Sequence, residues 1–296
     1  MELPEFITQA KENLIKKPWG GNWIPKLKGL EADKIGESWE FSAHPSNPSY
    51  VLINGKQISM IDLFSAFKRD LLGKLADKYN RFPILVKLLD IEDKISVQVH
   101  PSDEIALEFK ENDIGKDEGW IALSEGKVYV GLREDLRPEE ISRIVEKLNA
   151  FNAEFLDSFK IPAGTPHFAE NIRLFEVSTN SNITYRIYDF YGREPHLEKA
   201  IRALNFKKTP ETDIRSEKGK LRMEKFCAEV LKVSGVLSFE IDTFNILLPI
   251  EKDITLKGKE QKIELKQGYS CLIPARTKNF DIEADNALVI RVYPLR

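Results

Sequence analysis

Cysteine and histidine are scarce in this chain of 296 residues, which contains two cysteines and four histidines. The cysteines, Cys227 and Cys271, lie far apart and form no CxxC spacing. This excludes a cysteine-based zinc knuckle, and unpaired thiols suit a reducing compartment. Any bound metal must therefore take its ligands from His, Asp, Glu or amide side chains.

The chain also lacks a large charge of either sign and a long apolar run. Its 44 basic and 47 acidic residues nearly cancel, for a formal net charge of -3. That balance excludes the broad basic surface typical of proteins that bind nucleic acid or anionic membranes. No uninterrupted apolar stretch approaches the roughly 20 residues that span a bilayer. We therefore expect a folded cytoplasmic protein that binds neither nucleic acid nor membrane.

Most of the chain consists of short β-prone runs separated by Gly, Pro, Asn and Asp, among them "SWEFSAHP", "PILVKLLD", "KVYVGL" and "RLFEVST". This pattern predicts a mostly β protein built as an antiparallel sandwich or barrel. Two segments have helical periodicity instead, residues 59–79 and 136–155. The second has Pro138 in its first turn and apolar residues at Ile141, Ile144, Val145 and Leu148.

A degenerate internal repeat suggests two related barrels in tandem. "DSFKIPAGTPHF" (157–168) and "GYSCLIPARTKNF" (268–280) share Ile-Pro-Ala, then a Thr, then a Phe. A polar stretch after about residue 206 reads as a linker or arm, so we predict a metal-binding domain over 1–222 and a smaller β domain over 223–296. His167 of the first copy corresponds to Asn279 of the second. If that histidine binds metal, only the first domain does so.

The motif "ISVQVHPSDE" (95–104) places Gln98 and His100 two residues apart in a predicted strand. Side chains alternate between the faces of a strand, so both point the same way while Val97 and Val99 point the other. A buried polar pair needs partners, because an unpaired polar group costs on the order of 1 to 3 kcal/mol. Alone, such a pair more often meets water at a strand end than a metal.

Two further residues favour the metal interpretation. His167 follows a turn made rigid by Pro162, Gly164 and Pro166, and Glu118 in "GKDEGW" precedes an apolar strand. Two imidazoles, a carboxylate and an amide oxygen, with coordination positions left open, suit a catalytic Zn²⁺ site. We expect one Zn²⁺ per chain, with another divalent metal as the alternative. Only one ligand would be anionic, so the ion would stay a strong Lewis acid.

Three charged residues lie in apolar or aromatic strands, where a charge is expensive unless it has a partner. Lys87 in "PILVKLLD" should face an anion or water, or else extend its ammonium group out to solvent. Arg186 in "ITYRIYDF" could bind a phosphate or lie on the surface. Glu176 in "RLFEVST" is either an acid/base group or half of a structural ion pair. For His44 and His196, both close to prolines, we expect structural or surface roles.

Several motifs together resemble a known family. "KPWGGNWI", "IGESWEFSAHPSNPSYVLING", "PILVKLLDIEDKISVQVHPSDE", "GKDEGW", "IPAGTPHF" and "ITYRIYDF" occur in the order seen in type I mannose-6-phosphate isomerase, in its shorter prokaryotic form. The resemblance covers roughly residues 16 to 192. It implies a tandem cupin (jelly-roll) enzyme that interconverts mannose 6-phosphate and fructose 6-phosphate. It also implies the zinc ligands Gln98, His100, Glu118 and His167, and places Arg186 and Lys87 at the active site.

One position departs from the family pattern. Members usually carry an acidic residue four positions before the arginine of "TYR", and this chain has Asn182 there. The proton carrier stays open among Glu176, Lys87 and a metal-bound hydroxide, and the oligomeric state is open as well. Two alternatives to the isomerase are a non-catalytic phosphosugar sensor and an Fe²⁺ cupin oxidoreductase that uses His100, His167 and Glu118 as a facial triad.

Overall fold

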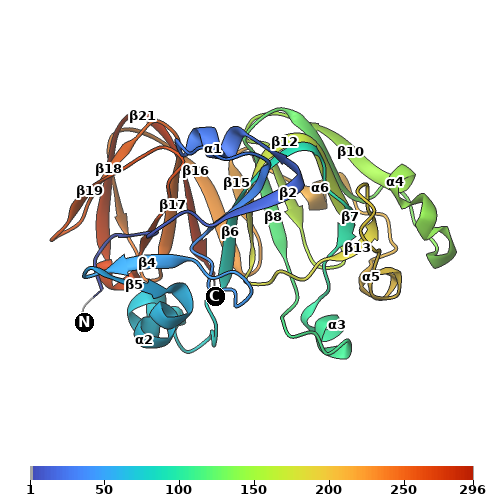
Figure 1. The fold of residues 1–296 in the computed structure, drawn as a ribbon, viewed down its shortest axis with the longest axis horizontal. Coiled ribbons are helices and arrows are strands. Elements are labelled where there is room, and N and C mark those ends of the chain that lie inside the picture. The colour runs from blue at the N-terminus through green and yellow to red at the C-terminus, as the bar shows by residue number, and fades with distance from the viewer. Residues whose placement is uncertain (1–2, 296) are drawn as a thin grey trace.

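Antiparallel β-strands make up most of the fold, as the sequence predicted. The computed structural model describes residues 3–295. Two curled sheets lie next to one another in it, with short helices around their edges (Figure 1). Within the described residues, no helix is long and apolar enough to cross a membrane.

The first sheet has eleven strands within the described part of the chain. They are β2 (Leu14–Gly21), β3 (Ile35–Glu40), β6 (Ile84–Lys94), β7 (Val97–Val99), β8 (Glu118–Ala122), β9 (Gly126–Leu132), β10 (Leu148–Ala153), β11 (Ser158–Ile161), β12 (His167–Thr179), β13 (Tyr185–Tyr188) and β14 (Arg215–Ser216). Strand β12 lies at the centre and pairs with β6, β7, β8 and β9. A bulge at Asn171, which has a φ of 50°, lets the two halves of β12 meet different neighbours.

The second sheet has eight strands between residues 3 and 295. They are β1 (Ile7–Thr8), β15 (Lys220–Arg222), β16 (Phe226–Glu240), β17 (Asn245–Glu251), β18 (Ile254–Lys257), β19 (Lys262–Leu265), β20 (Cys271–Ile273) and β21 (Asn279–Pro294). Strand β1, from the start of the chain, pairs with β20. The last strand of the first sheet along the chain is β14, and all strands from β15 on belong to the second. The predicted domain division at residue 222 stays a prediction.

One apolar cluster contains residues of both sheets and joins them. It includes Val86 and Phe175 of the first sheet with Phe226 and Ile290 of the second, and each is at most 1% exposed. Burial on this scale is the main favourable term in holding two sheets together. The sheets therefore share a core, and each also has an apolar cluster of its own.

Six α-helices and three 3-10 helices lie outside the sheets in the described residues. The α-helices are α1 (Trp23–Leu27), α2 (Met60–Leu72), α3 (Asp103–Glu108), α4 (Ile144–Lys147), α5 (Leu197–Ala203) and α6 (Glu211–Ile214). The 3-10 helices are η1 (Gly73–Leu75), η2 (Pro138–Arg143) and η3 (Ala275–Thr277), and a separate hairpin consists of β4 (Tyr50–Ile53) and β5 (Lys56–Ser59).

The helix predicted over 59–79 is present but shorter. The Ser59 side chain accepts a hydrogen bond from the Asp62 backbone N–H and caps α2, which ends at Leu72. Gly73 follows with a φ of 54°, where a Cβ atom would lie 2.2 Å from the backbone oxygen of Asp242. Close contact with the segment between β16 and β17 therefore accompanies the end of the helix before residue 79.

The helix predicted over 136–155 is wrong in its second half. Residues 138–147 form η2 and α4, but the chain then enters β10, which pairs with β9. Val145, predicted to lie in the apolar stripe, is 38% exposed. Pairing with an available strand edge outweighs a helical pattern that extends over only two or three turns.

Candidate metal and substrate site

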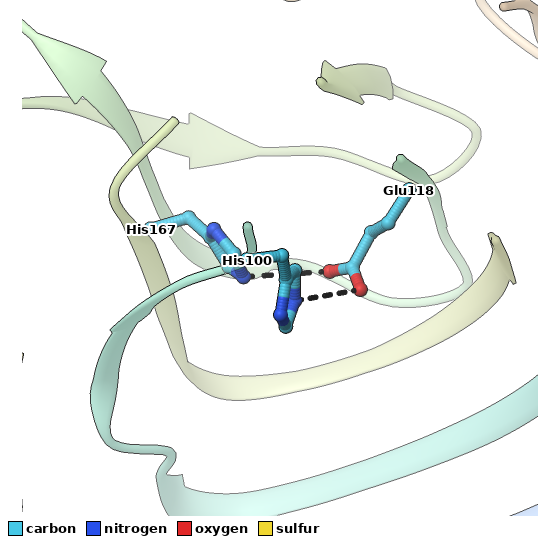
Figure 2. A group of neighbouring side chains, drawn as sticks. All are labelled: His100, Glu118 and His167. Atoms are coloured by element: carbon cyan, nitrogen blue, oxygen red, sulfur yellow. Dashed lines mark ion pairs between the residues drawn. The ribbon is translucent and has the colours of Figure 1, made fainter. Parts of the chain in front are cut away.

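Three side chains from in or next to separate strands of the first sheet converge on one point (Figure 2). His100 directly follows β7, Glu118 begins β8 and His167 begins β12. His100 Nε2 lies 3.1 Å from Glu118 Oε2, and His167 Nε2 lies 3.5 Å from Glu118 Oε1. All three residues are buried, and their ligand-type atoms lie within 4.8 Å of one another. This is the spacing of groups that can share a single metal ion.

Backbone carbonyls orient both imidazole rings. His100 Nδ1 lies 2.7 Å from the carbonyl oxygen of Ile183, and His167 Nδ1 lies 2.9 Å from that of Thr165. Because a carbonyl only accepts, each Nδ1 carries the proton and each Nε2 presents its lone pair towards Glu118. Burial lowers the pKa of His167 to about 3 and lowers the pKa of His100 as well. Both rings are therefore neutral at pH 7 and able to bind metal.

The atoms that converge here are acceptors with few donors among the described residues. His100 Nε2 and Glu118 Oε1 are buried and make no hydrogen bond to a described residue, and Glu118 Oε2 has only the Lys116 ammonium in contact with it. Buried polar atoms are rarely left in this state, and a divalent cation would satisfy them together. The residues present therefore fit a metal ion.

Gln98 lies beside this group, as its alternation with His100 predicted. Its Cα is paired with that of His167 across β7 and β12, and its Nε2 lies 3.2 Å from His167 Nε2. Rotating the amide by 180° exchanges nitrogen and oxygen, which are assigned rather than distinguished. Gln98 can thus present an oxygen to the same point.

Lys116 is a site residue that the sequence motifs did not indicate. Its ammonium contacts Glu118 Oε2 and lies 3.0 Å from Glu176 Oε1. Burial opposes the charge, but the two carboxylates outweigh it and raise the pKa of Lys116 above its ordinary value. The available signal was spacing, because residues 116 and 118 of an extended chain share a face.

Opposite charges continue from Lys116 in an alternating row. Glu176 Oε1 lies 3.3 Å from Lys87 Nζ, and Lys87 Nζ lies 3.9 Å from Glu37 Oε2. Glu37 Oε1 in turn lies 2.8 Å from Lys17 Nζ. Lys87 and Glu176 are direct cross-strand partners on β6 and β12. Lys87 therefore faces two anions, which is one of the two environments that its apolar strand suggested.

Trp39 contacts two members of this row, Glu37 and Lys87. Its indole N–H donates to Glu37 Oε2 over 2.6 Å, and the Lys87 ammonium lies 4.7 Å from the centre of its ring. Burial opposes ionisation of Glu37, but Lys87 and Lys17 outweigh it and lower the pKa of Glu37 to about 2. The Glu37 carboxylate is therefore fully charged at pH 7.

A cavity of about 220 Å³ borders the row. Gln98 and Asn182 line it, and so do seven charged residues: Lys17, Glu37, Lys87, Lys116, Glu176, Arg186 and Arg193. The predicted residues Lys87, Gln98, Glu176 and Arg186 thus share one cavity with the newly found Lys116 and Arg193. His100, Glu118 and His167 are buried and do not line it, but Gln98 and Lys116, which contact His167 and Glu118, do.

The two remaining histidines have structural contacts. His44 is buried, and its Nε2 lies 2.9 Å from Asp113 Oδ2. His196 Nε2 lies 3.1 Å from an Arg186 terminal nitrogen, and the two residues also share a backbone hydrogen bond of 2.7 Å. His196 is thus close to the cavity without lining it.

Asp113 links Asn182, which lines the cavity, to the segment that orients His100. Its Oδ2 accepts a 2.9 Å hydrogen bond from the Asn182 backbone N–H, and its Oδ1 accepts one of 3.0 Å from Arg81. The next residue after Asn182 is Ile183, whose carbonyl orients His100. Asp113 therefore holds the loop that fixes this imidazole.

Two family profiles match the chain. "Phosphomannose isomerase type I, catalytic domain" matches residues 11–119, and "Mannose-6-phosphate isomerase, cupin domain" matches residues 218–294. A mannose-6-phosphate isomerase from Streptococcus mutans is 36% identical over 70% of this chain and 70% of its own.

Solved structures of mannose-6-phosphate isomerases have the same fold as this chain. A putative mannosephosphate isomerase from Archaeoglobus fulgidus is 41% identical, with a TM-score of 0.94 over 100% of both chains. A mannose 6-phosphate isomerase with zinc bound has the same fold, with a TM-score of 0.84 at 17% identity over 99% of this chain and 100% of that one.

The curled antiparallel sheets and the buried His-Glu-His group define a cupin with a metal-type site, which confirms the fold expected from the sequence. Within that class, the chain belongs to the type I phosphomannose isomerase family.

Proposed function

We propose that this chain interconverts mannose 6-phosphate and fructose 6-phosphate. The observation that carries the proposal is the buried convergence of His100, Glu118 and His167 beside a cavity lined by acid, base and cationic groups. The relatives are named as isomerases of mannose 6-phosphate, and fructose 6-phosphate is the ketose that isomerisation between C1 and C2 would give. A match of 70% of the chain to an isomerase favours catalysis over the alternative of a binding-only sensor.

Gln98, His100, Glu118 and His167 are the residues that would hold the metal, which we take to be one zinc ion per chain. Zinc bound there would act as a Lewis acid and stabilise negative charge on the C1 and C2 oxygens of the sugar. Glu118 would be its only anionic ligand, so the site would keep a net positive charge. Lys116, which contacts Glu118, adds an N–H donor at the edge of the cavity.

Glu176 is our candidate for the group that carries the proton. Its carboxylate takes the proton from C2 while O1 gains one, which gives a cis-enediol. It then returns the proton to C1 while O2 loses one, which gives the ketose. Lys116 and Lys87 hold Glu176 Oε1 from two sides at 3.0 and 3.3 Å, so the carboxylate has a fixed position at the cavity.

Arg186 is our candidate for binding the phosphate, since a planar guanidinium suits a dianion. Its contacts are to neutral groups, the Glu194 carbonyl and His196. Lys87, in contrast, already faces Glu37 and Glu176. We therefore assign Lys87 to holding the catalytic carboxylate in place rather than to the phosphate.

The test is an isomerase assay on the purified protein, with metal analysis, before and after chelation. We expect about one equivalent of zinc, a loss of at least about 10²-fold on chelation, and recovery when zinc is returned. Full activity in the metal-free protein would overturn the proposal. Substrate binding without turnover would identify a sensor, and iron with oxygen uptake would identify an oxidoreductase.

The Glu176→Gln variant tests the proton carrier. We expect kcat to fall by roughly 10² to 10⁴, the usual contribution of a positioned acid or base, with zinc content unchanged. Glu170→Gln is the matched control, because Glu170 lies on the same strand and pairs with Lys94 and Lys127 outside the cavity. Equal activities of the two variants would exclude the role of Glu176.

A further inference from the structure

The five cations that line the cavity differ in whether a carboxylate balances their charge. Lys17, Lys87 and Lys116 are the three lysines that line it, and each lies within 4.0 Å of a carboxylate of the row. The row therefore offers little net charge to an incoming anion. The other two cations of the lining are Arg186 and Arg193.

Arg186 offers part of its guanidinium to a ligand. Its Nε donates to the Glu194 carbonyl over 3.2 Å, and its NH2 lies 3.1 Å from His196 Nε2. Both partners are uncharged, since burial and the nearby Arg186 lower the pKa of His196. These contacts hold one edge of the group, and among the described residues NH1 has no hydrogen-bond partner, so it can bind an anion.

Arg193, like Arg186, is held through its Nε and NH2 atoms, but its partner is a carboxylate. Asp189 Oδ2 accepts from Nε over 2.9 Å and from NH2 over 2.6 Å. Asp189 Oδ1 accepts the backbone N–H groups of Tyr191 and Arg193, each at 2.9 Å, so the carboxylate itself is fixed. The Asp189 side chain is 1% exposed and that of Arg193 is 37% exposed. The guanidinium is thus oriented before any ligand arrives, and no hydrogen bond from its NH1 to a described residue competes with a ligand.

The two arginines are close enough to influence each other. Burial, followed by the charge of Arg193, lowers the pKa of Arg186, and the nearby Asp189 carboxylate partly offsets this. Like charges held near one another are unfavourable, and an anion that contacts both relieves the repulsion. A dianionic phosphate, with its several acceptor oxygens, has the charge and geometry for two guanidinium groups.

We propose that Arg193, fixed by Asp189, is a second phosphate-binding residue that acts with Arg186 on the phosphate group of the sugar substrate. This inference rests on the proposed function for its substrate class. Arg193 contacts a part of the substrate that does not react, so its contribution is the same in the ground state and the transition state. Its removal should therefore raise KM and leave kcat nearly unchanged.

Arg193→Met tests the proposal in the zinc-loaded protein. We expect KM for mannose 6-phosphate to rise roughly 10- to 100-fold, the range for losing charge-assisted hydrogen bonds, with zinc content unchanged. Inhibition by inorganic phosphate should weaken in parallel. Asp189→Asn should raise KM by less, because Arg193 keeps its charge but loses its fixed position.

Arg215→Met is the matched control. Arg215 is 36% exposed and pairs at 3.0 Å with Asp157, which is 3% exposed, but it does not line the cavity. It should lose the same kind of ion pair without any change in KM. A KM for Arg193→Met equal to that of the control, at a normal melting temperature, would overturn the proposal.

Two further measurements separate the possible failures. If Arg193→Met does not fold, Arg193→Lys keeps the charge without the fork, and an unchanged KM in that variant would also count against the proposal. If the wild-type protein shows no isomerase activity, the proposed function fails. Calorimetric titration with inorganic phosphate then still tests Arg193, since binding equal to that of the Arg215 control would refute it.

Discussion

Lys116→Met is the most informative single change, because it should move activity and metal affinity in opposite directions. The Lys116 ammonium contacts Glu118, the carboxylate of the metal-type group, and lies 3.0 Å from Glu176. Methionine has a similar length and no charge. The change therefore removes one cation from between two buried carboxylates and leaves the packing nearly intact.

Three magnitudes follow from these contacts. Loss of the N–H donor at the cavity should lower kcat by about 10²- to 10³-fold. Without metal, Glu118 and Glu176 would lose their shared counter-charge, and breaking a buried pair costs about 3 to 5 kcal/mol of unfolding free energy. Lys116 also competes with a cation for Glu118. A unit charge and a divalent ion about 5 Å apart repel by several kcal/mol at an effective dielectric constant of about 20, so zinc should bind at least about tenfold more tightly.

The assay combines kinetics, zinc titration against a chromophoric chelator, and denaturant unfolding with and without zinc. Zinc should restore part of the stability lost in the variant, because it supplies positive charge to Glu118. Lys28→Met is the control, since Lys28 forms a buried 3.0 Å pair with Glu40 away from the cavity. It should lose similar stability with no change in zinc affinity.

A fall in zinc affinity parallel to the fall in activity would refute this reasoning. Lys116 would then support the shape of the metal site instead of opposing the charge of the ion. If Lys116→Met bound zinc more tightly with unchanged activity, the electrostatic competition for Glu118 would be supported. Lys116 would then have no role in the reaction.

Three other changes test separate parts of the structure. Asp113→Ala should weaken zinc binding up to about 10-fold, the lower end of the range for direct partners of metal ligands, because Asp113 acts through the Ile183 loop, and unchanged affinity would show that this loop is held without Asp113. The pKa of Glu37 is about 2 against an ordinary 4.5, so its charge contributes about 3 kcal/mol above pH 4.5, and this is lost as the pH falls to 2. Glu37→Gln should therefore be less stable than wild type at pH 6 and equal to it near pH 2 in denaturant titrations, and a gap that persists at pH 2 would contradict this. Asn279→Ala should leave about one zinc per chain, because Asn279 is exposed at the start of β21, and loss of zinc would place the metal in the second sheet.

The β fold and the proximity of Gln98 to the histidines were predictable because they depend on local rules. Alternation along a strand relates Gln98 to His100 without any knowledge of the partner strand. The turn before His167 depends on Pro and Gly residues close to it in the sequence. The approach of Glu118 to both histidines required the resemblance and ligand chemistry, because no local pattern relates these segments.

The row of alternating charges could not be predicted, because it depends on strand register. Glu176 and Lys87 lie far apart in the sequence and meet only because β12 and β6 pair as they do. A shift of one residue would turn Glu176 to the other face of the sheet. The strand β10 was missed for the same reason, since its partner β9 decides its structure more than its own periodicity does.

Asn182 stands where the family usually has an acidic residue, and its contacts show what a carboxylate at this position is not needed for. Asn182 lines the cavity, but it holds the loop through its backbone N–H, which donates to Asp113 over 2.9 Å. A carboxylate is therefore not needed at this position to orient His100 through Ile183. A neutral amide also gives the rim one negative charge fewer than an acidic residue would. The reduced repulsion favours binding of a dianionic phosphate beside Arg186. On the mechanism proposed above, Glu176 remains the base, so this substitution alters the binding of the anion more than the transfer of the proton.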